Sequence, residues 1–275
     1  YTDNYGMAEA TVESVTQVLD NVTSEVELAL GIVEGKPSWR KAMDFVQGAT
    51  LLWGFTTNFA TLVSLIRHPE GFSHHVRTLL KHQAYLDFSS CFCAFLILVM
   101  PPLWMTGNFN FDSAVCYLWY SQVIYWFFLF ASVHNLVYLA YERYMAILKP
   151  IQYKDITPTK TWIGIMIVDV TAVFVDWPIA LQSRMTGNQC GPGYVWTTQL
   201  MVNMIKVYAV FLWLTDYCIP IACFFYFYGK VIYVVYKKSH EGIGGSKSTA
   251  MEKASAQLTK AAVAVTTVFI VTFTY

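Results

Sequence analysis

Long apolar runs are the feature that most constrains this 275-residue chain. A helix that crosses a bilayer needs about 20 mostly apolar residues, and it must satisfy its own backbone hydrogen bonds because no water is present. Six runs reach this length: 43–66, 79–104, 117–141, 162–182, 200–236 and 254–275. Only 13% of the residues are charged, whereas a soluble domain carries about 25%. The sequence therefore predicts an all-α transmembrane protein that crosses the lipid bilayer several times.

The lysines and arginines predict which side of the membrane each loop faces. Segments 67–81, 143–160 and 230–260 contain 3, 4 and 6 of the 18 basic residues. Basic loops tend to stay in the cytoplasm, so we expect the N-terminal segment 1–40 to be extracellular. Asn21 begins an Asn-Val-Thr sequon in that segment, which predicts glycosylation on the outer side. A formal net charge of zero argues against a nucleic-acid partner.

Two of the six cysteines are expected on the outer side. Cys116 lies at the outer end of the third run and Cys190 lies in the second outer loop. That compartment is oxidising, so we expect a disulfide between them. The alternative is a pair of free thiols near the outer surface.

One aspartate deep in an apolar run suggests an ion site, because charged groups at membrane depth are costly. Asp87 lies in the second run, and Asn58 and Ser132 could approach it from the first and third. A single carboxylate with neutral oxygen ligands suits Na⁺ better than a divalent ion. The alternative is a polar seam filled with water, and the spacing alone does not decide between the two.

Three further aspartates interrupt apolar runs. We expect Asp169 to pair with a donor on a neighbouring helix. Asp176 and Asp216 could each face a cavity and hold a cationic ligand group, or each could pair with another helix. His134 is expected to be a packed, hydrogen-bonded side chain. The sequence has no metal-ligand spacing, no phosphate-binding loop and no Ser-His-Asp arrangement, so we expect neither enzymatic activity nor an organic cofactor.

The segment 141–153 at the end of the third run reads YERYMAILKPIQY. An acid beside an arginine at a helix end forms an ion pair with which an inserting partner can compete, and Pro150 ends the helix. This string resembles the signature of the rhodopsin-like (class A) G-protein-coupled receptors. The resemblance implies that Glu142 holds Arg143 at rest. It also implies that Arg143, with Tyr144 beside it, contacts a heterotrimeric G protein after activation.

The resemblance also implies a fold and a location. It implies a seven-helix receptor bundle over 41–275, with six helices present and the seventh missing, in a chain truncated in or after helix six. It implies a signalling receptor in the plasma membrane that binds an extracellular ligand. The family's Na⁺ site uses residues at the places of Asn58, Asp87 and Ser132, which favours an allosteric sodium ion here.

The same family has a packing switch in its helices. Pro220 and Tyr228 keep the family's eight-residue spacing in helix five. The resemblance implies that Val133, Pro220 and Phe269 repack on activation. Phe273 is at the place where most members carry a tryptophan that senses the ligand.

Two departures from the family are informative. Cys116 lies 27 residues before Arg143, two more than usual, which predicts an irregular turn where helix three begins. In the second run, His82 and Gln83 stand where the family prefers an asparagine and a leucine. We therefore expect a divergent or orphan member.

The ligand is less constrained than the family. The amine receptors carry an aspartate where this chain has Tyr125, followed by Trp126, which disfavours an ordinary amine receptor. We expect a peptide ligand, with Tyr125, Trp126, Asp176 and Asp216 as candidate contacts. The alternatives are a receptor for a cationic small molecule or a polytopic transporter. The chain shows no inverted repeats, which argues against the transporter.

Overall fold

The computed structural model describes residues 38–68, 73–99, 106–187, 189–192 and 199–240. The chain divides into two compact units, 1–49 and 50–275. Helix α2 (Ser38–Arg67) begins in the first unit and continues into the second. Every other element described below belongs to the second unit.

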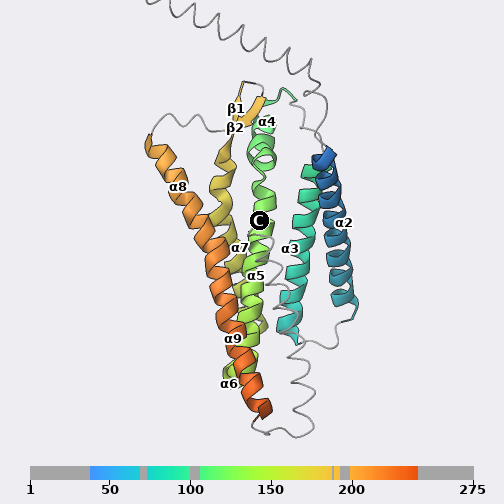
Figure 1. Ribbon diagram of the computed structural model, residues 1–275, viewed down its shortest axis with the longest axis vertical. Helices are drawn as coiled ribbons and strands as arrows, with labels where there is room; N and C mark the ends of the chain where they lie inside the picture. Colours follow the sequence, from blue (N-terminus) through green and yellow to red (C-terminus); the bar gives the residue numbers. More distant parts are fainter. Residues whose placement is uncertain (1–37, 69–72, 100–105, 188, 193–198, 241–275) are drawn as a thin grey trace, which may run out of the picture. The chain divides into compact units, whose positions relative to one another are not determined.

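The second unit is mainly helical (Figure 1). Its elements, in chain order, are α3 (His74–Val99), α4 (Phe109–Val115), the π-helix η1 (Cys116–Tyr120), α5 (Val123–Leu148), α6 (Pro150–Lys154), α7 (Pro158–Asp176), the 3₁₀-helix η2 (Trp177–Gln182), strands β1 (Ser183–Thr186) and β2 (Gln189–Pro192), α8 (Gln199–Trp213), the π-helix η3 (Leu214–Cys218) and α9 (Ile219–His240).

Within the described residues, five helical stretches are long and apolar enough to cross a membrane. They are Ala42–Arg67, His74–Val99, Phe109–Leu148, Pro158–Gln182 and Asn203–Val234. The first five predicted spans are therefore confirmed as helices. The sixth predicted span, 254–275, lies outside the described residues.

Three predicted boundaries were wrong. The helical stretch Phe109–Leu148, made of α4, η1 and α5, extends beyond the predicted 117–141 at both ends, and at its start Asn108 caps a helix that begins earlier. Its side chain accepts hydrogen bonds from the amides of Asn110 and Phe111. Helix α3 likewise starts before the predicted 79–104, because polar residues near a membrane surface need not interrupt a helix.

The predicted irregular turn at the start of helix three is confirmed. The π-helix η1 ends at Ser121, and Gln122 adopts a left-handed conformation with φ of 61° before α5 begins. The Ser121 hydroxyl donates to the Tyr117 carbonyl (2.5 Å) and accepts from the Val123 amide (3.2 Å). These bonds satisfy backbone groups that the break would otherwise leave unpaired. The π-helix η1 and the break at Gln122 accommodate the two additional residues that separate Cys116 from Arg143 in this chain.

Helix α5 packs against α3, α7 and α9, and Figure 1 shows it between them. Small residues allow the close approach: Ala131 and Ala172 are buried and pack with Leu86. On α7, a Cβ atom added to Gly164 would overlap the Tyr138 side chain of α5. The glycine therefore leaves room for Tyr138 in its present position between the two helices.

A short hairpin and a disulfide close one end of the bundle. Strands β1 and β2 pair antiparallel, with Met185 opposite Cys190. Cys190 forms a disulfide with Cys116 of η1, as predicted. We call this the disulfide end. The opposite end, where α5 finishes near α6, is called the Arg143 end (Figure 1).

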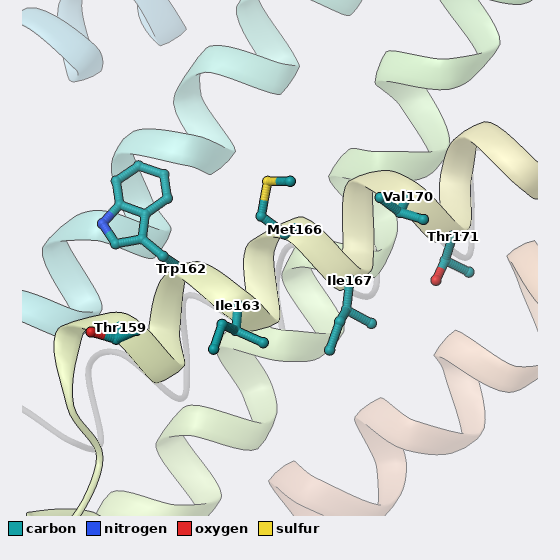
Figure 2. A pocket seen from close by; sticks show the side chains of 7 residues that line it. All are labelled: Thr159, Trp162, Ile163, Met166, Ile167, Val170 and Thr171. Atoms are coloured by element: carbon teal, nitrogen blue, oxygen red, sulfur yellow. The ribbon is translucent and has the colours of Figure 1, made fainter.

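The outer face of α7 is apolar and exposed. Figure 2 shows a hollow whose lining side chains all come from this helix: Thr159, Trp162, Ile163, Met166, Ile167, Val170 and Thr171. The five large apolar side chains among them are 45% to 61% exposed. In a bilayer such a face suits contact with lipid chains. The hollow is therefore surface relief on one helix and not an interhelical ligand cavity.

Candidate functional site

The predicted acid–arginine pair is present at the Arg143 end. Arg143 Nε donates to Glu142 Oε2 at 2.6 Å. Glu142 is only 3% exposed, so the pair lies in a poorly hydrated place where its attraction is strong. Among the described residues, the buried Nη2 atom of Arg143 has no hydrogen-bond partner. One face of the guanidinium is therefore still able to bind another acceptor.

Glu142 has a second partner that sequence reasoning did not assign. Tyr153 of α6 donates its hydroxyl to Glu142 Oε1 at 2.5 Å, and Ser73 Oγ lies 3.3 Å from the same hydroxyl. Burial raises the pKa of Tyr153, and the bond to Glu142 adds to this, so the hydroxyl keeps its proton at neutral pH and donates. The position of Tyr153 in the 141–153 string, eleven residues after Glu142, is the sequence feature that could have indicated this contact. Both oxygens of Glu142 are thus held.

Tyr144 contacts helix α9. Its ring lies 5.4 Å from that of Phe227 and 6.0 Å from that of Tyr226, both on α9. Lys149 Nζ lies 5.9 Å from the Tyr144 ring centroid. Tyr144 therefore joins α5 to α9, and its predicted contact with a G protein stays a prediction.

Three of the predicted switch residues lie in the core between α5 and α9. Val133 and Pro220 are buried, and Tyr228 packs with Ala140 and Phe224. The two others, Phe269 and Phe273, lie outside the described residues, as does the sequon at Asn21. The switching role stays a prediction.

Asp87 accepts hydrogen bonds from two neighbouring side chains. Ser132 of α5 donates to Oδ1 at 2.5 Å. Gln83, one helical turn before Asp87 on α3, donates from Nε2 to both carboxylate oxygens at 3.0 Å. Gln83 Nε2 also lies 2.6 Å from Ser132 Oγ. The predicted proximity of Asp87 and Ser132 is confirmed, whereas the role of Gln83 was missed.

The hydrogen bonds continue from Gln83 across three helices. Asn135 of α5 donates to Gln83 Oε1 (2.9 Å) and to the Leu79 carbonyl (3.2 Å). His82 Nδ1 lies 3.1 Å from Asn135 Oδ1, and His82 Nε2 lies 3.3 Å from Asp169 Oδ1 on α7. Asp169 thus lies close to a donor on a neighbouring helix, as expected, but its Oδ1 has no hydrogen-bond partner among the described residues. We call Asp87, Gln83, Ser132, Asn135, His82 and Asp169 the polar network.

The predicted sodium ligands are only partly brought together. Asn58 donates to the Gly54 carbonyl of its own helix at 2.9 Å, and not to Asp87. The donors that surround Asp87 are N–H and O–H groups, whereas Na⁺ requires oxygen lone pairs. Among the described residues, no group of three or more His, Cys, Asp or Glu side chains could hold a metal ion. In this arrangement the Gln83 amide, and not an oxygen ligand, lies against both oxygens of Asp87.

A second acidic site lies nearer the disulfide end. Asp176 ends α7 and is 1% exposed, and Asp216 belongs to η3 and is 7% exposed. Within the described part of the chain, no carboxylate oxygen of either residue has a hydrogen-bond partner. Tyr208, eight residues before Asp216, donates its hydroxyl to the carbonyl of Val175, which precedes Asp176, so the two segments that carry the acids are in contact. We call these two residues the acid pair.

The π-helix places Asp216 inside. Pro220 has no amide hydrogen, and its ring clashes with the carbonyl four residues earlier, which is that of Asp216. The chain widens there, and the Ile219 amide donates to the Leu214 carbonyl. An extra residue in a helix rotates the following face by about 100°. This local distortion explains how an acid in a largely exposed apolar run becomes buried.

His134 of α5 lies beside the acid pair. Its Nδ1 lies 2.8 Å from the Phe130 carbonyl and therefore donates to it, as expected for a packed histidine. Its Nε2 lies 3.9 Å from Asp216 Oδ1, too far for a good hydrogen bond. Tyr208 of α8 donates its hydroxyl to the Val175 carbonyl at 2.7 Å. Neither His134 nor Tyr208 therefore donates a hydrogen bond to a carboxylate of the acid pair.

Tyr125 and Trp126 form an aromatic stack on α5. Their rings lie 5.2 Å apart, and Trp126 stacks on Phe130 at 5.4 Å. Both side chains are half-buried. Phe130 thus links this stack to His134 through its backbone carbonyl.

These features define a class of protein. A multi-pass helical bundle with a disulfide to η1 at one end and a buried Glu–Arg pair at the other has the arrangement expected of a seven-helix receptor. The family model "7 transmembrane receptor (rhodopsin family)" matches residues 57–275, which is most of the chain. The chain belongs to the rhodopsin family of seven-transmembrane receptors.

Curated relatives are distant and bind different kinds of stimulus, as their names state. Cephalotocin receptor 2 of Octopus vulgaris is 26% identical over 62% of this chain and 41% of that receptor. Histamine H4 receptor of Mus musculus is 27% identical over 67% and 49%. Rhodopsin of Ambystoma tigrinum is 24% identical over 67% and 52%. The chain spans about half the length of the curated relatives that it matches.

Proposed function

We propose that this receptor binds an extracellular ligand at the disulfide end and activates a heterotrimeric G protein at the Arg143 end. The family and the buried Glu142–Arg143 pair support the coupling. The basic segments 67–81, 143–160 and 230–260 support a cytoplasmic Arg143 end. The same rule supports an N-terminus outside, and membership of the receptor family supports a location in the plasma membrane.

The Arg143 end suggests how coupling would work. At rest, Glu142 holds Arg143 through Nε, and Tyr153 holds the other Glu142 oxygen. A G protein that presents backbone carbonyls could bind the Nη2 atom of Arg143, which is buried and has no hydrogen-bond partner among the described residues, once the Arg143 side chain moves outward. Because the bonds to Glu142 oppose release, binding and release would compete. The free energy of the Glu142–Arg143 bond therefore opposes activation, and G-protein binding must exceed it.

The acid pair is the observation that supports a ligand class. A buried ionised carboxylate without partners is costly, and a cationic partner lowers that cost. Asp176 and Asp216 both lack hydrogen-bond partners among the described residues. An ammonium carries three N–H donors and a guanidinium five, so either could bind both acids. We propose a ligand with a basic group that reaches the acid pair.

The ligand we favour is a peptide with a basic side chain. Tyr125 replaces the aspartate of the amine receptors, and it lies in an aromatic stack on α5. The acids instead come from α7 and η3, so the charge is held from another side of the bundle. A cationic small molecule is the second candidate, because the same two carboxylates would bind its ammonium group.

The coupling is tested by nucleotide exchange on full-length receptor in membranes with purified Gα subunits. Peptides with arginine or lysine and a set of small amines are the two ligand arms. Arg143→Ala should abolish ligand-dependent exchange while surface expression is kept. Lys154→Ala removes an exposed basic residue of α6 and should leave exchange unchanged. Full exchange in Arg143→Ala would refute the proposed coupling role.

A further inference from the structure

The polar network has a direction that a backbone group sets. The Leu79 carbonyl can only accept a hydrogen bond, and Asn135 lies 3.2 Å from it. The Asn135 group that faces Leu79 must therefore be its NH₂. This group also faces Gln83 at 2.9 Å, so that atom of Gln83 is its carbonyl oxygen. The orientations of the Asn135 and Gln83 side-chain amides both follow from the Leu79 carbonyl, which can only accept hydrogen bonds.

The orientation of Gln83 then determines which hydrogen bonds Asp87 accepts. With its oxygen turned to Asn135, Gln83 presents its NH₂ to Asp87 and Ser132. One N–H is directed to the Ser132 oxygen, and the other is shared between the two Asp87 oxygens. The Ser132 hydroxyl then gives its own hydrogen to Asp87. Every hydrogen on these groups has an acceptor.

The other end of the network agrees with this direction. Asn135 Oδ1 can only accept, so His82 Nδ1 donates to it. His82 Nε2 lies 3.3 Å from Asp169 Oδ1. The N–H of His82 Nδ1 therefore agrees with the direction that the Leu79 carbonyl sets.

We propose that the Gln83 carboxamide is a built-in substitute for a cation at Asp87, so that this receptor excludes Na⁺ from the place where the family binds it. The N–H groups of Gln83 bring partial positive charge to both carboxylate oxygens, from within the protein. Gln83 is 8% exposed and Asn135 is fully buried. To admit Na⁺, Gln83 would have to turn its oxygen to Asp87. Its NH₂ would then meet the NH₂ of Asn135, which Leu79 holds in place.

Exclusion of Na⁺ can be measured as the effect of Na⁺ on the stability of the ligand-free receptor. A ligand that binds only the folded state raises its stability in proportion to the logarithm of ligand concentration. Na⁺ should therefore stabilise a receptor with an open sodium site and leave this one unaffected. The response does not depend on the identity of the extracellular ligand. It can be measured even if the proposed function is wrong.

The experiment compares NaCl with choline chloride at constant ionic strength on purified full-length receptor in lipid nanodiscs. Thermal unfolding is followed with a thiol-reactive dye, which reports exposure of the free cysteines Cys91, Cys93, Cys218 and Cys223. The wild-type midpoint should be the same in both salts. Gln83→Glu replaces the donor with an acceptor of the same shape, so its midpoint should be low in choline chloride. In NaCl, saturating at about ten times the dissociation constant, it should rise by about 3–5 °C.

Matched variants separate the network from general effects. Gln83→Leu removes the donor at similar size and should also gain a Na⁺ response, which keeps the test available if Gln83→Glu does not fold. Adding Asp87→Asn to either variant should remove the response. Gln152→Glu makes the same change on an exposed face of α6 and should show no Na⁺ effect.

Two outcomes would overturn the proposal. The first is a saturable Na⁺ stabilisation of the wild type that Asp87→Asn abolishes, which needs no Gln83 variant to be measured. The second is a folded Gln83→Glu or Gln83→Leu receptor that responds to Na⁺ no more than the wild type does. A gain of response in the variants, with none in the wild type, supports the proposal.

Discussion

Asp87 and Asp216 are both aspartates in apolar helices of one bundle, yet their surroundings are opposite. Asp87 accepts bonds from Gln83 and Ser132, and the network continues from there to α7. Asp216 has no hydrogen-bond partner among the described residues, and neither has Asp176 beside it. A satisfied buried acid fixes how helices pack, whereas an unsatisfied one is costly and is kept where a partner can arrive. The contrast supports a structural role for Asp87 and agrees with the ligand-binding role that we propose for the acid pair.

The largest effect is expected at Asn135, the fully buried centre of the polar network. Asn135→Ala removes its bonds to Leu79, Gln83 and His82. At about 0.6 kcal/mol for each bond between membrane helices, the loss is about 2 kcal/mol. The midpoint of thermal unfolding should then fall by about 4–8 °C.

The control for Asn135 is Asn58→Ala. Asn58 donates to a carbonyl of its own helix, so its loss should lower the midpoint by less than about 1 °C. Equal losses of unfolding midpoint in Asn135→Ala and Asn58→Ala would show that the interhelical bonds of the polar network add no stability beyond that of a bond within one helix.

The next effect has opposite signs in the two regions. Asp87→Asn places a donor among donors, so it should destabilise ligand-free receptor by about 1 kcal/mol. Asp176→Asn removes a charge that has no partner, so it should stabilise the receptor by about 1 kcal/mol. Both are measured as unfolding midpoints in the same lipid. Two shifts of the same sign would remove the distinction between the regions.

The smallest effect concerns Glu142, a third buried acid, which is satisfied like Asp87. Tyr153→Phe removes one of its donors. A net loss of about 0.5–1 kcal/mol from the resting state should raise basal nucleotide exchange about two- to fivefold. Tyr233→Phe on α9 changes an exposed tyrosine and serves as the control. Unchanged basal exchange in Tyr153→Phe would show that this bond does not restrain Arg143.

Much of this fold was predictable from sequence, because helices in a membrane satisfy their own backbone and so follow hydropathy. The family string, the disulfide and the extra residues before α5 also have local signals. Helix ends were less predictable, since the Asn108 cap and the polar start of α3 lie outside the apolar windows.

The site was only partly predictable for a different reason. Asp87 and Ser132 were foreseen as neighbours, but Gln83 read as a departure from the family pattern without a role. Its function depends on the Leu79 carbonyl and on Asn135 of another helix, which no local pattern relates. Similarly, the π-helix that turns Asp216 inward depends on Pro220 and on the packing around it.

The most direct test of the account is the concentration dependence of ligand-stimulated nucleotide exchange in wild-type and Asp216→Asn receptors. The ligands are the basic peptides and the small amines described above. The account predicts that an active ligand carries a basic group. It also predicts that Asp216→Asn raises the half-maximal concentration about tenfold or more, as for the loss of a buried ion pair, and leaves maximal exchange intact. Active ligands without a basic group, or an unchanged half-maximal concentration in Asp216→Asn, would contradict it.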